Sequence, residues 1–124
     1  MKIINSKNAP AAIGPYSQAT MKNGMLFISG QLGFKLDTGT IAESFEEQTE
    51  LVFSHLKNIL AEANLTFSNV IKVSVFVKDM GKFPILNEIY KKYFTEPFPA
   101  REVIEVRDLP KSGDVEISLI AMEN

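Results

Sequence analysis

The chain has 124 residues, of which 45% are hydrophobic and 23% are charged, as is typical of a single globular domain with a hydrophobic core. Its formal net charge of -2, pI near 5.4 and interspersed charges do not favour a partner with a phosphate backbone, so nucleic acid is not expected. Cysteine is absent, which excludes disulfides, thiolate catalysis and thiolate metal sites.

The only imidazole is His55, so a Ser-His-Asp triad would have to be built around it and a multi-histidine metal site is excluded. The first ten residues lack the apolar core of a signal peptide, and no apolar run approaches the length of a membrane span. We therefore expect one domain over residues 1–124, located in the cytoplasm and without a membrane partner.

The first part of the chain predicts a short extended segment around Ile3 and then a hairpin. Gly14-Pro15 marks a turn, and the aromatic hydroxyl of Tyr16, which follows it directly, could pack over a loop or face a site. Asn23-Gly24 lies between two apolar runs and readily adopts a type I′ turn, so a β-hairpin is expected there. The hairpin ends at Ser29-Gly30, where glycine either permits close approach of a ligand or marks a bulge.

A long helix is expected from Ser44 to Asn64, because its apolar residues recur at helical spacing. Ser44 followed three residues later by Glu47 fits a capping box, and Asn64 is an acceptable helix end. His55 is next to Leu56 but off the centre of the apolar stripe. We interpret it as a surface or helix-flank residue rather than a catalyst.

The run Val70–Val77 is rich in β-branched residues and predicts a central strand. Asp79 can cap a second helix from Met80 to Phe94, in which Pro84 is tolerated because it falls near the first turn. Asn87 shares a helix face with three aromatic residues. If buried, its amide needs a hydrogen-bond partner, so it is either a structural tie or a group directed at a site.

Two further strands are predicted within residues 99–110 and 115–121, from their alternation and their Pro and Gly boundaries. Arg101 stands at the start of the first strand and Glu116 at the start of the second. If the two strands are neighbours, the guanidinium and the carboxylate could face one pocket. Arg suits a small carboxylate because its planar fork donates two parallel hydrogen bonds. The alternative is a surface ion pair with a nearby acid.

The order of elements predicts an α+β fold in which one mixed sheet carries both helices on a single face. The strands then supply more apolar side chains than one layer of helices can cover, so some are expected to point away from the helices. Such a surface predicts a homo-oligomer that buries it. The apolar residues concerned are Val73, Val75, Ile104, Val106, Ile117 and Leu119.

Seven ordered motifs, spread over nearly the whole chain, resemble the RidA/YjgF family of reactive-intermediate deaminases. The resemblance implies a chorismate-mutase-like fold and a cytoplasmic homotrimer with an active site in each cleft between subunits. Family members with the site Arg hydrolyse enamines and imines such as 2-aminoacrylate to 2-keto acids and ammonia. The motifs are AIGPYSQA (12–19), FISGQL (27–32), VIKVSVFVKD (70–79), NEIYKKYF (87–94), PAR (99–101), LP (109–110) and VEI (115–117).

The resemblance also assigns roles to individual residues. Arg101 matches the Arg that binds the substrate carboxylate, and Glu116 matches the acid that orients the attacking water. No metal or organic cofactor is expected. The other matched positions are the aromatic gate Tyr16, the polar residues Ser29 and Asn87, and the main chain of Gly30 and Val103.

The chain departs from the family pattern after the Arg, where Glu102 and Val103 replace Ser and then Cys or Ala. Glu102 is expected to add a negative charge near an anion site and so to affect substrate preference. Two other functions stay open: a non-catalytic module that binds a 2-keto acid or another small carboxylate, and the ribonuclease or translation-inhibitor activity associated with some relatives. The acidic charge balance weighs against the second.

Overall fold

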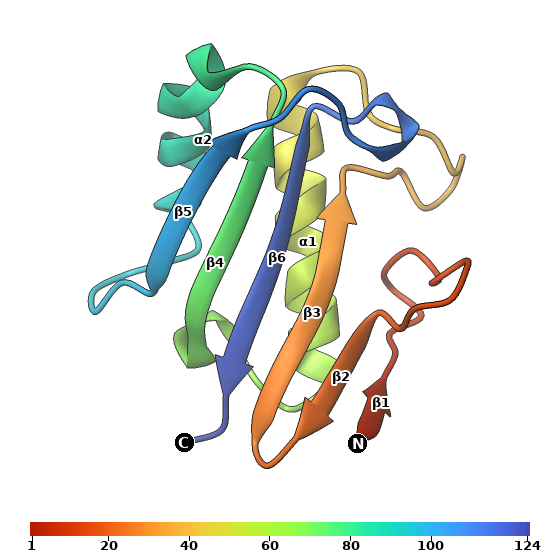
Figure 1. Ribbon diagram of the computed structural model, residues 1–124, viewed down its shortest axis with the longest axis vertical. Helices are drawn as coiled ribbons and strands as arrows, with labels where there is room; N and C mark the ends of the chain where they lie inside the picture. Colours follow the sequence, from red (N-terminus) through yellow and green to blue (C-terminus); the bar gives the residue numbers. More distant parts are fainter.

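One mixed β-sheet forms the body of the computed structural model, which describes residues 1–124 (Figure 1). Its strand order is β1-β2-β3-β6-β4-β5. Strands β4 and β5 are parallel, and all other neighbouring pairs are antiparallel. The strands are β1 (Lys2–Ile4), β2 (Ala19–Lys22), β3 (Met25–Leu32), β4 (Val70–Val77), β5 (Ala100–Glu105) and β6 (Val115–Met122).

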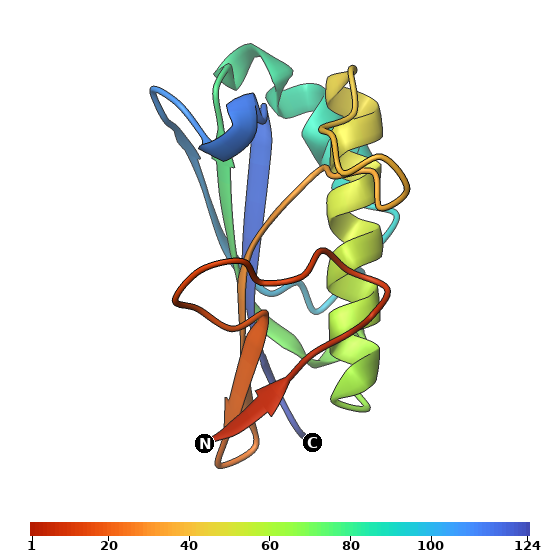
Figure 2. The same cartoon turned by 90° about the vertical axis from the view of Figure 1, so that its right-hand side faces the viewer.

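Two α-helices cover one face of this sheet and leave the other face open (Figure 2). They are α1 (Phe45–Glu62) and α2 (Phe83–Tyr90). Three short 3₁₀ helices, η1 (Phe67–Asn69), η2 (Met80–Lys82) and η3 (Pro110–Ser112), lie in the connections. The expected α+β architecture, with both helices on a single face, is therefore confirmed. None of the helices combines the length and the apolar character needed to cross a membrane.

The predicted hairpin and long helix are both present. Asn23 and Gly24 have φ angles of 51° and 77°, which form the turn between β2 and β3. The Ser44 hydroxyl accepts a hydrogen bond of 3.0 Å from the Glu47 N–H and caps α1. Asn64 follows the helix with a φ of 58°, as expected for a residue at a helix end.

The second predicted helix, Met80 to Phe94, is wrong in its extent because the structure divides it. Asp79 accepts a hydrogen bond of 2.8 Å from the Gly81 N–H and caps η2 rather than α2. Pro84 lies in the first turn of α2, where its missing N–H costs little. The α-helix ends at Tyr90, and the chain continues in turns to Phe94.

The sequence did not decide which apolar strand residues point toward the helices and which point away. Four of them lie on the helix-facing side of the sheet and are buried there. Val73, Val75 and Ile117 are fully buried and Leu119 is 2% exposed, all under the helix layer. Ile104 does point to the open face, where it is 45% exposed. Val106 lies beyond the end of β5. The expected surplus of apolar residues is therefore smaller than the sequence suggested, because these four residues occupy alternate positions of β4 and β6 and all point toward the helices.

The open face of the sheet nevertheless has an apolar component. Phe27 and Met122 are 43% and 44% exposed, and Phe76 and Ile120 are half-buried beside them. The register pairs Phe27 with Ile120 across β3 and β6, so these side chains are neighbours. The homo-oligomer stays a prediction. The exposed residues that support it are Phe27, Ile104 and Met122.

Candidate functional site

Arg101 is held in a fixed orientation between strand β5 and helix α2. It pairs in the sheet with Val73, so its side chain leaves the sheet on the helix-facing side. One Nη1 donates a hydrogen bond of 2.8 Å to the Asn87 side-chain oxygen. The guanidinium carbon lies 4.6 Å from the centre of the Tyr90 ring and 5.4 Å from that of Phe83, both within cation–π distance.

These contacts decide between the alternatives that the sequence left open for Arg101 and Asn87. Arg101 forms no ion pair with any acid of the chain, so the surface-pair interpretation is wrong. Asn87 is the tie that orients the guanidinium. Since a guanidinium has five N–H donors, most of them stay available to a ligand.

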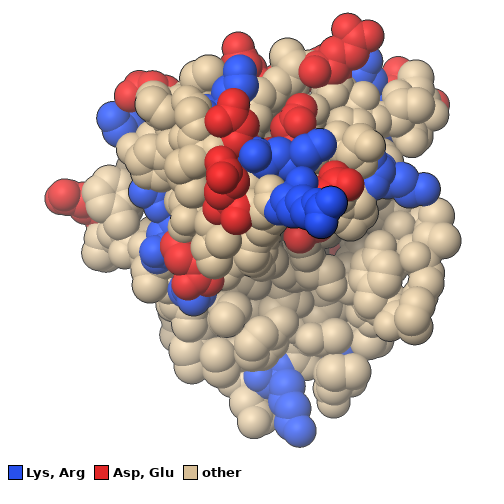
Figure 3. Space-filling model, turned by 45° about the horizontal axis from the view of Figure 1, so that its top comes forward, with Lys and Arg blue, Asp and Glu red and all other residues tan.

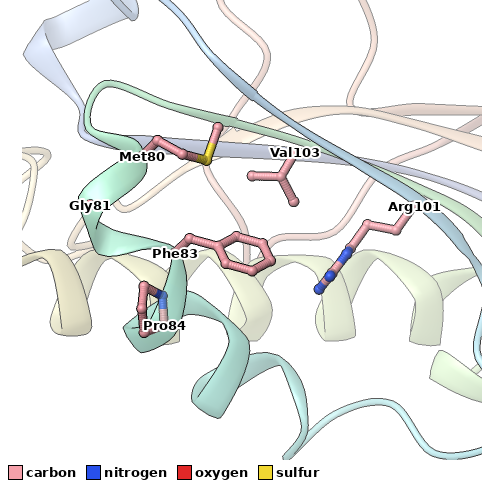
Figure 4. Close-up of a pocket in the computed structure, with 6 residues that line it drawn as sticks. All are labelled: Met80, Gly81, Phe83, Pro84, Arg101 and Val103. Carbon is pink, nitrogen blue, oxygen red and sulfur yellow. The ribbon is translucent and has the colours of Figure 1, made fainter.

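A cavity of about 580 Å³ opens beside the guanidinium (Figure 4). In Figure 4 the side chain of Arg101 extends from the strand toward the ring of Phe83 on the helix, with Val103 above the space between them. We call this cavity the Arg101 pocket. It is lined by Met80, Gly81, Phe83, Pro84, Arg101 and Val103.

Glu116 lies in a second cavity, of about 910 Å³, which we call the Glu116 pocket. Its side chain is half-buried, and this burial raises the pKa of Glu116 above its ordinary value of 4.5. The predicted residues Tyr16, Ser29 and Gly30 line the same cavity. The structure therefore places three other predicted site residues in the same cavity as the Glu116 carboxyl group.

The main chain at Gly30 is in direct contact with the Glu116 carboxyl group. A Cβ atom at Gly30 would lie 2.6 Å from the Cδ of Glu116, closer than any real contact. The absence of a Cβ at Gly30 therefore leaves the space that the Glu116 carboxyl group occupies. The neighbouring Ser29 hydroxyl donates a hydrogen bond of 2.7 Å to the Ser17 carbonyl and so holds the Tyr16 loop. Tyr16 itself is 54% exposed at the rim.

Within one chain, Arg101 and Glu116 do not share a pocket. Strand β4 lies between β5 and β6, so the two strands are not neighbours as the sequence hypothesis required. Glu116 pairs with Phe76 on the open face, whereas Arg101 projects from the helix-facing side. No residue lines both pockets. The idea that both charges face one pocket is wrong for a single copy of the chain.

The structure also corrects the expectation for Glu102. Its carboxylate accepts a hydrogen bond of 2.8 Å from the Ser74 hydroxyl and lies 3.2 Å from the Lys72 ammonium. The Ser74 hydrogen bond, followed by Lys72, lowers the pKa of Glu102. Because side chains alternate along β5, this cluster occupies the face opposite Arg101. Glu102 therefore does not place its charge at the Arg101 pocket of its own chain.

The prediction for His55 is wrong as well, because this side chain is buried and only 1% exposed. Its Nε2 is 2.8 Å from the Phe34 carbonyl oxygen, and Phe34 lines the Glu116 pocket. The sequence contained a usable signal, since His55 stands three residues after Val52 and four before Ile59. That spacing places all three on the buried face. Gln48, also buried at 2% exposed, was missed entirely.

The fold and the two pockets define a small α+β protein that carries an oriented Arg and a half-buried Glu. The sequence profile of the family described as "Endoribonuclease L-PSP" matches residues 6–123. The chain belongs to this family, which is the YjgF/RutC/RidA family that the motifs indicated.

Individual relatives match along nearly the full length of the chain. A RutC family protein of Aquifex aeolicus is 43% identical over 99% of this chain and 100% of its own. A 2-iminobutanoate/2-iminopropanoate deaminase of Bos taurus is 42% identical over 98% of this chain and 90% of its own. The crystal structure of RidA from an Antarctic Psychrobacter superposes with a TM-score of 0.95 at 40% identity, covering 99% and 100% of the two chains.

A Gly30→Ala substitution is expected to displace the Glu116 carboxyl group into solvent, because the new Cβ would occupy its place. The pKa of Glu116 should then fall toward 4.5, since burial is what raises it. A ¹³C NMR titration of the Glu carboxyl carbons measures this shift. The control is Gly39→Ala, where no atom lies within 4 Å of the new Cβ, although the φ of 72° adds local strain. An unshifted Glu116 in Gly30→Ala would contradict the contact.

His55 should make the folding stability depend on pH. Burial lowers the pKa of His55 from its ordinary value of 6.5, against the smaller effect of the Phe34 carbonyl. The unfolded chain therefore binds a proton below about pH 6.5 that the folded chain resists, so the free energy of unfolding falls as the pH drops through this range. Urea unfolding at pH 7.5 and 5.5 measures this loss. His55→Gln should show a smaller loss than the unsubstituted chain, and an equal loss would refute the prediction.

Proposed function

We propose that this protein hydrolyses enamine and imine intermediates, such as 2-aminoacrylate, to 2-keto acids and ammonia. The observation that carries the proposal is the oriented, unpaired guanidinium of Arg101 in one pocket and the half-buried Glu116 in another. A cation with a fixed fork suits a substrate carboxylate. The name of the Bos taurus relative describes a deaminase that acts on 2-imino acids, which supports the same substrate class.

The proposal requires two copies of the chain, because Arg101 and Glu116 lie on opposite faces of one sheet. We propose a homotrimer in which the Arg101 pocket of one subunit meets the Glu116 pocket of the next. The open sheet face supports this arrangement, since Phe27, Ile104 and Met122 are each more than 40% exposed on it. A surface of this kind is commonly buried between subunits.

In this mechanism Arg101 binds the substrate carboxylate and fixes the position of the imine carbon. Asn87 and the rings of Tyr90 and Phe83 hold the guanidinium before the substrate arrives, so little orientation has to be gained on binding. Val103 contributes a wall of the same pocket. The main role of this half of the site is thus orientation.

Glu116 supplies the acid–base step in the other half. It accepts a proton from a water molecule as the water oxygen bonds to the imine carbon, and it passes this proton to the imine nitrogen, which forms a neutral carbinolamine. It then accepts the proton of the new hydroxyl group and passes it to the nitrogen as the C–N bond breaks, which releases ammonia and leaves the keto group. A raised pKa suits a group that must both accept and donate a proton. Tyr16, Ser29 and Gly30 would enclose the water and the imine.

The family description also names an endoribonuclease, and the charge distribution does not support that activity for this chain. On the surface that Figure 3 shows, Lys and Arg side chains are interspersed with Asp and Glu rather than collected in a basic patch. Binding of a 2-keto acid without catalysis is the other alternative, and tight binding without faster imine loss would favour it. The cytoplasmic location stays a prediction.

Arg101→Ala should remove most of the deaminase activity. Losing two charge-assisted hydrogen bonds, together about 3 kcal/mol, corresponds to about a 100-fold fall in kcat/KM. The assay follows pyruvate formation from freshly generated 2-aminoacrylate through a coupled dehydrogenase. Arg101→Lys keeps the charge without the fork and should be intermediate. An Arg101→Ala variant that retains most of its activity would rule out the carboxylate clamp.

Mixing two inactive variants tests whether the site is shared between subunits. Arg101→Ala and Glu116→Ala chains each lack one half, but a mixed trimer contains sites with Arg101 from one variant and Glu116 from the other. After random exchange of subunits between equal amounts of the two variants, about half of the chains carry an intact Arg101 and about half an intact Glu116. About a quarter of the shared sites then contain both residues, so about a quarter of the activity should return. Light scattering on the same samples should give the mass of three chains. If both residues act from one chain, mixing restores nothing.

A further inference from the structure

Helix α1 carries three buried polar side chains that the proposed chemistry does not use, and two of them have hydrogen-bond partners outside the helix. Gln48 and His55 are 2% and 1% exposed, although both are surrounded by the apolar core. They stand seven residues apart, which is two helical turns, so they lie on the same side of the helix. Polar groups this deeply buried are costly unless their hydrogen bonds are made. Both side chains make these hydrogen bonds with segments outside α1.

His55 holds the connection between β3 and α1, which forms one wall of the Glu116 pocket. Its Nε2 donates to the Phe34 carbonyl at 2.8 Å. Phe34 also bridges to Ile41 across this loop, so the His55 hydrogen bond joins the base of the loop to α1. Phe34, Lys35 and Leu36 all line the pocket. The Nδ1 atom is buried without a partner, so the Phe34 contact is the only hydrogen bond of the ring.

Gln48 holds the same loop at its other end and joins it to the start of β6. Its side-chain nitrogen donates to the Ala42 carbonyl at 3.0 Å and to the Asp114 carboxylate at 2.9 Å. Its side-chain oxygen accepts from the Asp114 N–H at 2.8 Å. Asp114 stands two residues before Glu116. At the β3 end of the loop, a Cβ on Gly33 would lie 2.5 Å from the Gln48 Cα, so the loop and the helix are in close contact there as well.

The two side chains thus connect one rigid helix to both walls around Glu116. In Figures 1 and 2 the β3–α1 loop and the segment leading into β6 lie at the same end of the sheet, beside the start of α1. A helix of 18 residues packed on the sheet is a stiffer support than either loop. Small displacements of a catalytic group are costly, because orientation is a large part of catalysis.

We propose that Gln48 and His55 are positioning residues that set the shape of the Glu116 pocket from beneath. Their effect on turnover rests on the deaminase function proposed above, whereas their effect on the loop does not. Removing either tie should loosen the loop first and slow the reaction as a consequence. The Arg101 pocket contains neither residue and should be unaffected.

The decisive variants are His55→Leu, which removes the donor at similar volume, and His55→Gln, whose amide can donate to the same carbonyl. Hydrogen–deuterium exchange at the Lys35 and Ala42 amides reports on the loop, because both are bonded within it. His55→Leu should exchange at least about 10-fold faster there, as expected for the loss of about one hydrogen bond. His55→Gln should exchange at close to the original rate.

Activity provides the second measurement. The kcat/KM of His55→Leu should fall about 10-fold, mainly through kcat, because the carboxylate clamp is intact while the walls around Glu116 move. His55→Gln should recover most of this loss. If His55→Leu does not fold, Gln48→Met removes the ties to Ala42 and Asp114 and should produce the same pattern.

Thr49→Val is the matched control. Thr49 is fully buried on the same helix, and its hydroxyl donates only to the Phe45 carbonyl within α1. It should lower overall stability without accelerating exchange in the loop. Equal acceleration by Thr49→Val, or an unchanged loop and kcat/KM in His55→Leu, would overturn the proposal. A chain with no imine hydrolysis would refute the deaminase function alone, because loop exchange is measured without substrate.

Discussion

The arrangement of the whole site depends on the parallel pairing of β4 with β5. Because parallel strands need a crossover, the chain passes through η2 and α2 between them, and this crossover supplies Phe83, Asn87 and Tyr90 beside Arg101. The same pairing places β4 between β5 and β6. Arg101 pairs with Val73 and Glu116 with Phe76, and these two positions face opposite sides of β4, so the two charges lie on opposite faces of the sheet. The topology of β4 and β5 thus builds the surroundings of the cation, while the register keeps Arg101 and Glu116 of one chain apart.

The two charged residues of the candidate site are controlled in different ways. The Arg101 guanidinium keeps its charge in any environment, so the protein controls its orientation through Asn87 and two aromatic rings. Glu116 is controlled through burial, which raises its pKa and makes proton exchange easier. Close contact with Gly30 keeps the carboxyl group in that half-buried position. Orientation in one half and proton affinity in the other are the two requirements of imine hydrolysis as we propose it.

Local patterns predicted the elements better than their extents and surroundings. The Asn23-Gly24 turn and the Ser44 cap depend on neighbouring residues only, and both are present, although the Glu47 side chain does not complete the predicted capping box. The predicted second helix, Met80 to Phe94, is longer than α2. The reason is that Asp79 caps a short 3₁₀ turn, and such a cap gives the same sequence signal as the cap of an α-helix. His55 was assigned to the surface because a polar residue near the edge of a stripe is usually exposed, whereas here a loop carbonyl far along the chain satisfies it.

The sequence by itself determined the fold class, the family and a few of the residues that line the two pockets, because motifs and periodicity are local properties. These residues are Tyr16, Ser29, Gly30, Arg101, Val103 and Glu116. Only the tertiary structure decided which of those residues meet, since strand order and side-chain alternation fix directions that no single segment contains. It turned Glu102 away from Arg101 toward Ser74 and Lys72. It also separated Arg101 from Glu116, because the register pairs them with Val73 and Phe76, which point to opposite faces of β4.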